Sequence, residues 1–221
     1  MYRYLALAVT GILILAAGEA SPAAVVDAVL GEAGDTVITL GDIALARGLR
    51  LFGLQPSEAP VQREELDRFV DALVVAEEAR QLGVAPTEEE GHAAWNAAAM
   101  RVGGMEALLA WLDGNGIDRG WARRMVEADL RRRQFIALRF QAFAFVPEPD
   151  VDAALGPGSH TPEERERVRE SLLAAATEEG LAAWLHEARG RVRVRHAEFD
   201  RSAAPIPFPM PSSAHRDPAR P

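Results

Sequence analysis

Cysteine is absent from the chain, and so is lysine. Without cysteine no disulfide can form, so the fold must be held together by a hydrophobic core. Aromatic residues make up only 6% of the sequence, and alanine, leucine, glutamate and arginine dominate it. That composition favours helices. The net charge of −9 argues against general binding to nucleic acid, because phosphate repels an acidic surface.

The first 20 residues have the pattern of an export signal. Tyr2-Arg3-Tyr4 is a short basic start, and the apolar run over residues 5–17 is too short to span a bilayer comfortably. Small residues at Gly18-Glu19-Ala20 suit a signal peptidase, with Ser21 as the mature start. No cysteine follows the run, which excludes a lipid-anchored lipoprotein. We therefore expect a periplasmic protein with a signal peptide over residues 1–20; an inner-membrane anchor over residues 5–17 is the alternative.

Periodicity and capping signals predict a mainly α fold in one domain over residues 21–196. Three Thr residues stand three positions before an acidic residue, as in a capping box: Thr39, Thr87 and Thr161. Together with helical spacing they predict helices over about 40–51, 63–81, 88–102, 105–112, 119–145 and 162–188. Pro147 and Pro149 are expected to bracket the end of the fifth helix.

Short β-strands are predicted at both ends of this domain. Residues 25–29 and 36–39 form the expected hairpin, with a turn over 32–35. Residues 191–195 alternate strictly between Arg and Val, as in a strand with one buried face. Because a lone strand needs a partner, the helix at about 162–188 and this strand should pack back on the N-terminal hairpin. Residues 197–221 contain six prolines from Pro205 onward and are expected to form a disordered or polyproline-like tail.

No pattern predicts a catalytic residue, a metal site or a cofactor. The five histidines form no His-x-x-x-His pair, and no serine lies in a G-x-S-x-G elbow. Gly103-Gly104 and Gly114-Asn115-Gly116 are helix ends without the strand–turn–helix context of a phosphate loop. Catalysis and nucleotide binding are therefore not expected.

Large apolar residues are the candidates for a binding surface. Met and Trp side chains suit an adaptable surface that accepts varied sequences, but they also build helical cores, and both interpretations stay open. The candidate peptide-binding residues are Trp95, Met100, Met105, Trp111, Trp121, Met125, Phe143 and Phe145.

The fifth predicted helix is rich in arginine, which allows two interpretations. Glu127 with Arg131 and Asp129 with Arg133 are spaced as i,i+4 ion pairs, which indicates a solvated, paired face. A basic binding patch is the other interpretation. The stretch over residues 58–90 is acidic and could face this helix.

Three stretches follow one another in an order typical of one protein family. They are Val26–Val29 with Val37–Ile43, Asp113–Ile117 with Arg123–Val126 and Leu130–Arg133, and Leu181–Arg189 with Val192–Val194. The first resembles the opening hairpin and first helix of the SurA family of periplasmic chaperones. The second is similar to the start of that family's long fourth helix, and the third to its C-terminal helix and closing strand. The resemblance implies a core that handles unfolded outer-membrane proteins.

The chain departs from this family between its last two helices. Family members usually carry one or two parvulin-type prolyl isomerase domains there, and such a domain needs on the order of a hundred residues. The interval over residues 150–160 is far too short. The isomerase activity of the family is therefore not expected in this chain.

The expected function is that of a non-catalytic periplasmic chaperone for unfolded or partly folded envelope proteins. The alternative is a scaffold or assembly factor for one folded envelope partner, with the Pro-rich tail as its docking segment. Neither interpretation involves nucleic acid or a nucleotide. The chain is expected to be a monomer or a segment-swapped dimer, with Gly156-Pro157-Gly158 as the natural hinge.

Overall fold

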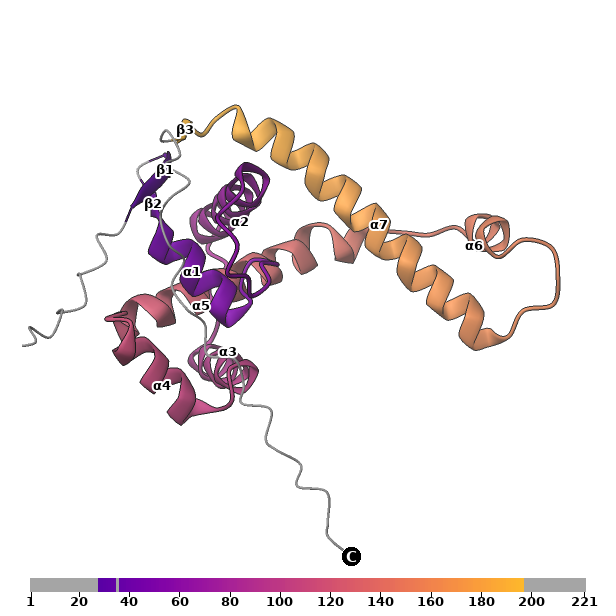
Figure 1. Cartoon of the computed structure of the whole chain (residues 1–221). Coiled ribbons are helices and arrows are strands. Elements are labelled where there is room, and N and C mark those ends of the chain that lie inside the picture. Colours follow the sequence, from indigo (N-terminus) through magenta and orange to yellow (C-terminus); the bar gives the residue numbers. More distant parts are fainter. Residues whose placement is uncertain (1–27, 35, 197–221) are drawn as a thin grey trace, which may run out of the picture.

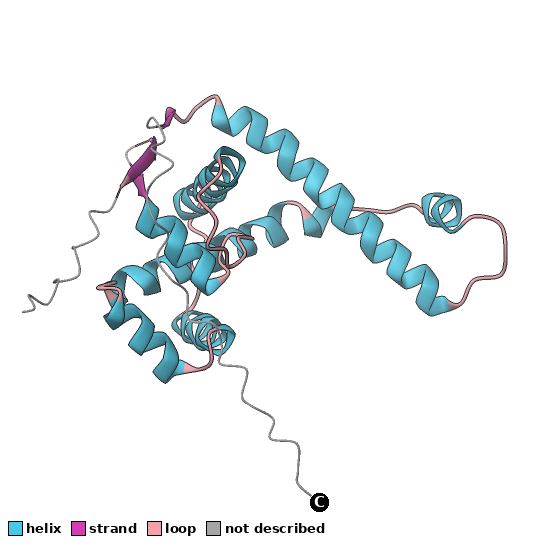
Figure 2. Ribbon diagram, in the orientation of Figure 1, coloured by secondary structure: helices cyan, strands magenta, loops and turns pink. Residues whose placement is uncertain are grey.

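The computed structural model describes residues 28–34 and 36–196, so the predicted signal peptide and the Pro-rich tail lie outside the described residues. Helices dominate this part of the chain, and a small three-stranded sheet lies at one end (Figures 1 and 2). The elements, in chain order, are β1 (Val29–Ala33), β2 (Thr36–Thr39), α1 (Leu40–Leu49), α2 (Arg63–Gln81), α3 (Glu88–Arg101), α4 (Met105–Gly114), α5 (Arg119–Arg139), the 3-10 turn η1 (Gln141–Phe143), α6 (Glu148–Leu155), α7 (Pro162–Arg189) and β3 (Val194–His196).

The sheet joins the two ends of the described chain. Its order is β2-β1-β3 with antiparallel neighbours, and Ala33 pairs with Thr36 on one side and with Val194 on the other. The backbone N–H of Gly34 also donates to the carbonyl of Arg193 at 2.9 Å. The predicted mainly α fold with a sheet made from an N-terminal hairpin and a returning C-terminal strand is therefore confirmed.

The first and last strands differ from their predicted bounds. The first strand was expected over residues 25–29, and β1 shares only Val29 with that range; residues 25–27 lie outside the described residues. Glu32 and Ala33, expected in the turn, belong to β1. The closing strand begins at Val194 instead of residue 191, because the backbone N–H groups of Arg191 and Val192 bond to the last turn of α7. Orphan carbonyls at a helix end attract such bonds, and they withdraw these two residues from the sheet.

Side-chain hydrogen bonds cap the starts of four helices, α1, α3, α5 and α7. Thr39, Thr87 and Thr161 all cap their helices in full capping boxes, with the N-cap N–H donating to the acidic side chain at 2.8, 2.7 and 2.8 Å. Asp118 caps α5 by accepting from the N–H of Trp121 at 2.7 Å. These bonds satisfy amide groups that the first helical turn leaves unpaired, which is why the four starts matched their sequence signals.

The predicted end of α5 was wrong. The helix ends at Arg139, η1 follows, and Pro147 and Pro149 begin the short helix α6 instead of bracketing the end of α5. Pro suits the first positions of a helix because its missing N–H has no partner there, and Glu148 and Asp150 add favourable charge to this first turn. The interval over residues 150–160, which was expected only to connect two helices, therefore includes part of a further helix.

The core centres on α1, which is apolar nearly all round and has nine of its ten residues buried. Residues from α2, α3, α4 and α5 surround it in one continuous apolar cluster. The buried Arg47 of α1 is satisfied by Glu65 (Nε to Oε1, 2.7 Å) and by the carbonyls of Ser57 and Ala59 at 3.1 and 2.8 Å. Among the described residues no buried side-chain polar atom lacks a partner.

Helix α7 belongs to two parts of the molecule. Its C-terminal part packs on the body through the buried Trp184 and Ala188, and Arg189 pairs with Asp71 of α2. Residues 162–176 are not buried, and together with α6 they project from the body in Figure 1. We call α6 and residues 162–176 the arm, and the remaining described residues the body. Within the described chain, none of the helices has the length and apolar character needed to cross a membrane.

Candidate functional site

Three aromatic rings attach the C-terminal part of α7, and through it the arm, to the end of α5. Phe135 of α5 lies 5.5 Å from Trp184 of α7, and Phe140 lies 6.0 Å from Phe135 and 6.2 Å from Trp184, measured between ring centroids. The Arg139 guanidinium lies 5.9 and 6.0 Å from the two Phe rings. At Gly180 a Cβ atom would already meet Cδ1 of Phe140 at 3.4 Å, so a larger side chain would separate α7 from this cluster. Aromatic pairs of this geometry stabilise beyond their buried area, which anchors the end of α5.

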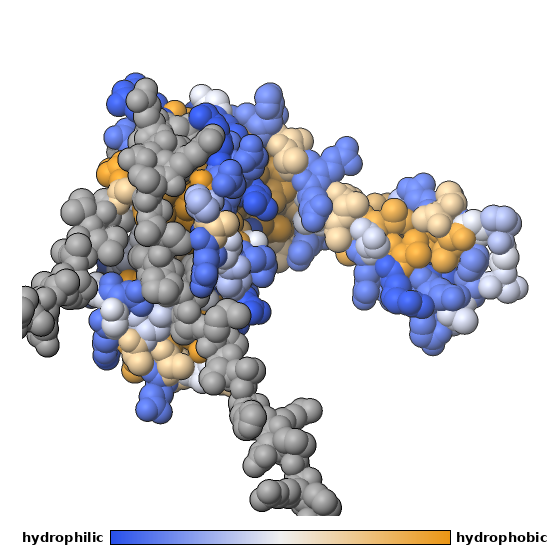
Figure 3. Space-filling view, in the orientation of Figure 1, coloured by the Kyte–Doolittle hydropathy of each residue, from blue (hydrophilic) through white to orange (hydrophobic). Residues whose placement is uncertain are grey.

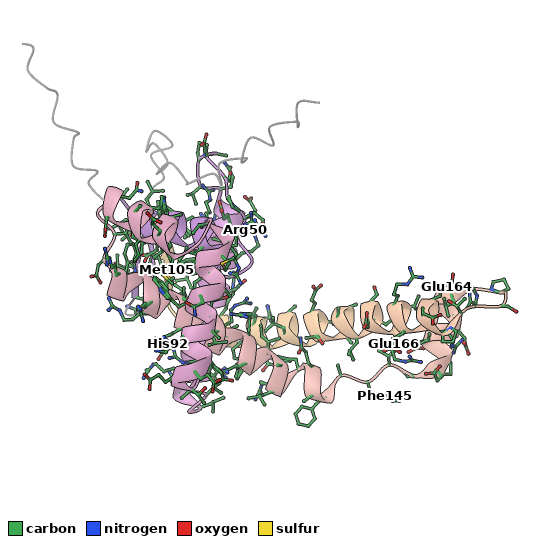
Figure 4. The ribbon with its side chains drawn as sticks, turned by 90° about the horizontal axis from the view of Figure 1, so that it is seen from below. Arg50, His92, Met105, Phe145, Glu164 and Glu166 are labelled. Atoms are coloured by element: carbon green, nitrogen blue, oxygen red, sulfur yellow. The ribbon has the colours of Figure 1, made fainter. Side chains whose placement is uncertain are left out.

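Large apolar side chains lie open to solvent directly beside this anchor. Leu138, Phe143 and Phe145 are 62%, 81% and 80% exposed, and they lie within eight residues at the end of α5, in η1 and in the following loop. We call these three residues the junction surface. η1 packs beside α7, which places the junction surface where arm and body meet. Figure 4 shows Phe145 on the loop leading to the arm, and Figure 3 shows apolar areas on the body beside the arm and on the arm itself. Exposed apolar groups gathered in this way are typical of interaction sites.

The structure divides the eight predicted binding residues between core and surface. Trp95, Trp111 and Met125 are buried, and Met105 and Trp121 are half-buried against the same core. Met100 is 75% exposed, but it lies on α3 in the body, apart from the arm. Phe143 and Phe145 are both exposed and lie two residues apart in the sequence, in η1 and in the loop that follows it.

Leu138 was missed by the sequence analysis. Its spacing of three residues from Phe135 is that of a buried helix face, and Phe135 is indeed buried. Among the described elements nothing covers Leu138. Its exposure depends on the path that α7 takes across the end of α5, which is a feature of the tertiary structure. No local sequence signal could have found it.

The arginine-rich helix α5 is largely paired, as the first interpretation predicted for Asp129 and Arg133. Asp129 binds Arg133 at 3.1 Å and Arg132 at 3.2 Å, and it also accepts the backbone N–H of Phe52 at 2.9 Å. The predicted pair of Glu127 with Arg131 does not form in the described structure.

Arg131 acts on the acidic helix α2 instead, which packs along α5. A hydrogen bond from Arg80, with smaller contributions that include the charge of Arg131, lowers the pKa of Glu77 to about 2. Arg131 and Arg123 also line a cleft of about 350 Å³ with Glu88 and Glu127, and Arg123 lies 5.0 Å from the Trp95 ring. Charges of both signs balance in this cleft, so it has no strong preference for an anion or a cation.

The described residues contain no group of three His, Asp or Glu side chains placed to hold a metal ion. An ion pair or a helix cap lowers the pKa of four carboxyl groups, those of Glu77, Glu90, Glu148 and Glu164. A lowered pKa means that the charged carboxylate is stabilised by its neighbours, as in a structural ion pair. A general acid needs a raised pKa instead. The junction surface itself consists of three apolar side chains without a titratable group.

The sequence matches no protein-family model, and no curated protein matches it either. The resemblance to the SurA family stays a prediction that rests on the stretches quoted above.

Proposed function

We propose that the chain is a non-catalytic periplasmic chaperone that binds unfolded or partly folded envelope proteins at the junction surface. The observation that carries the proposal is the exposure of Leu138, Phe143 and Phe145 within eight residues, beside a rigidly packed aromatic anchor. A folded protein gains nothing in stability from exposing three such side chains together. A client segment that covered them would remove apolar area from water on both partners.

The surface suits extended segments that carry aromatic residues. The exposed rings of Phe143 and Phe145 offer a large contact area at a low cost in side-chain entropy. Arg139, which lies over the Phe140 ring, adds a cation that can also contact an aromatic side chain of a client. Apolar contact is not directional, so a surface of this kind discriminates little between sequences. Binding should be weak and fast, as release of many different clients requires.

Residues 144–161 also support a function without prolyl isomerase activity. They contain only α6 and two short connections between η1 and α7, so no parvulin-type domain is present at that point of the chain.

Light scattering tests the proposal directly. An unfolded outer-membrane β-barrel protein is diluted into buffer with and without the purified chain. We expect suppression of scattering at near-stoichiometric ratios, and a several-fold loss of suppression in the double variant Phe143→Ala, Phe145→Ala. Met100→Ala is the matched control, because Met100 is similarly exposed but lies on α3.

Circular dichroism of each variant establishes that it is folded. A folded wild-type chain that suppresses no scattering contradicts the chaperone function and favours the scaffold for a single partner. Equal losses in the control and in the double variant would contradict the junction surface as the binding site.

A further inference from the structure

Helix α6 packs on α7 through one fully buried side chain, that of Val151. Val151 is fully buried, yet it does not belong to the continuous core of the body. α6 packs against α7, so α7 is the element that covers Val151. The contact is thus a small satellite cluster on the arm, remote from the main core.

The face of α7 beneath α6 combines apolar and basic residues. Arg165, Val168, Arg169 and Leu172 are half-buried and spaced at i, i+3, i+4 and i+7, which places them on one side of the helix. We call these four residues the arm face. Arg165 binds Glu148 and Asp152 of α6, each at 2.7 Å, and Arg169 binds Glu148 as well. The arm face therefore recognises α6 by charge as well as by apolar contact.

The amino-acid pattern of α6 shows what this face accepts. Val151 and Leu155 are four residues apart, and the carboxylates of Glu148 and Asp152 lie one turn before and one position after Val151. These are the features of a short amphipathic segment with an acidic flank. Any segment with the same pattern presents the same groups to Arg165 and Arg169.

Three features make α6 easy to displace. A helix of eight residues is too short to persist in water without packing. The ion pairs that hold it are exposed and therefore screened by salt. Gly156 and Gly158 have φ of 76° and 146°, values that suit glycine, and they give the connection to α7 unusual conformational freedom. We therefore expect α6 to open before the helices of the body.

We infer that the arm face is a second binding surface, specific for acidic amphipathic segments of a client, and that α6 is its resident occupant. Displacement of α6 would expose the half-buried Val168 and Leu172 of α7 as additional apolar area for a client. The inference rests on the proposed function in that the displacing segment comes from a client.

A labelled peptide with the sequence of residues 147–156 tests recognition by the arm face. Val151→Asp removes the apolar anchor of α6 and leaves α7 unchanged, so it vacates the arm face. Ala153→Asp is the matched control, since it makes the same charge change at an exposed position of the same helix. By fluorescence anisotropy we expect at least tenfold tighter peptide binding to Val151→Asp than to wild type or Ala153→Asp. Adding Arg165→Gln and Arg169→Gln should abolish the gain.

Equal affinity of the three proteins for the peptide would overturn the inference, as would a gain that survives the two arginine substitutions. Hydrogen exchange of the wild-type chain provides a test that needs no substitution. We expect the amides of α6 to exchange faster than those of α2, and faster still with a bound client. Exchange of α6 that is as slow as that of α2, or unchanged by a client that suppresses scattering, overturns displacement while leaving the chaperone function intact.

The reverse outcome is also distinguishable. If the peptide binds the vacated arm face but no client is held, the proposed chaperone function fails and recognition of acidic segments stands. Sedimentation of the wild-type chain identifies the remaining occupant: a dimer that the arginine substitutions dissociate would assign the arm face to α6 of a second copy and overturn the client as its partner.

Discussion

The body and the arm both use arginine–carboxylate pairs, but in opposite environments. In the body Arg47 and Glu65 are almost completely removed from solvent, and two backbone carbonyls complete the guanidinium's hydrogen bonds. In the arm Arg165 and Arg169 meet Glu148 at the surface. A buried pair is costly to break, because the remaining charge stays in an apolar surrounding, whereas an exposed pair returns to water at little cost. The same chemistry thus makes the body rigid and the arm labile.

Glu65→Ala should give the largest effect of the changes considered. It leaves the Arg47 guanidinium buried without its carboxylate, and we expect a loss of about 3–5 kcal/mol in the free energy of unfolding. Asp113→Ala removes the exposed partner of Arg119 and should cost less than about 1 kcal/mol. Urea denaturation followed by circular dichroism measures both. Similar losses in the two variants would show that burial does not distinguish these ion pairs.

Trp184→Ala should weaken the attachment of the arm to the body. The ring packs on Phe135 and Phe140, and its removal should cost about 3 kcal/mol. Hydrogen exchange should accelerate most in the C-terminal part of α7 and in η1, with smaller changes in α1. Leu138→Ala is the control on the exposed side of the junction and should change stability by no more than about 0.5 kcal/mol. Uniform acceleration throughout the chain would contradict a separate anchor for the arm.

Helices with their own capping signal, including the part of α7 in the arm, were easier to predict from the sequence than α6. The capping bonds of Thr39, Thr87 and Thr161 join residues only three positions apart, so the sequence alone predicted these helix starts. The strict Arg-Val alternation before His196 indicated the returning strand. α6 was missed because its helix depends on α7 and not on its own eight residues.

The candidate site shows the same division. For Trp95 and Trp111 the sequence favoured the core but left a surface position open, and the structure buries both. Phe143 and Phe145 are exposed, although the helix expected to end just after them stops at Arg139, so they lie in η1 and in the following loop and not at the end of α5. Leu138 had the spacing of a buried residue, and its exposure is a property of the whole arrangement.

Acidification should produce the smallest but most selective effect, the release of α6. Hydrogen bonds from Arg169 and then Arg165 hold the pKa of Glu148 below its ordinary value of 4.5. A carboxyl group with a lowered pKa in the folded state contributes stability above 4.5, and this contribution is lost as the pH falls through the lowered value. The docked state of α6 is therefore expected to hold at neutral pH and to weaken as the pH falls below about 4.5.

Methyl resonances report this release without depending on amide exchange. Between pH 7 and pH 3 the Val151 methyl groups should shift toward their solvent-exposed positions, while those of Val70, buried in α2, stay constant as an internal reference. Glu148→Gln should displace α6 partly at neutral pH and flatten the titration, because the amide carries no charge for Arg169 to attract. A Val151 titration that is unchanged by Glu148→Gln would assign the pH response to another group. If Val70 shifted together with Val151, the body and the arm would unfold as one unit, and the contrast between them would not hold.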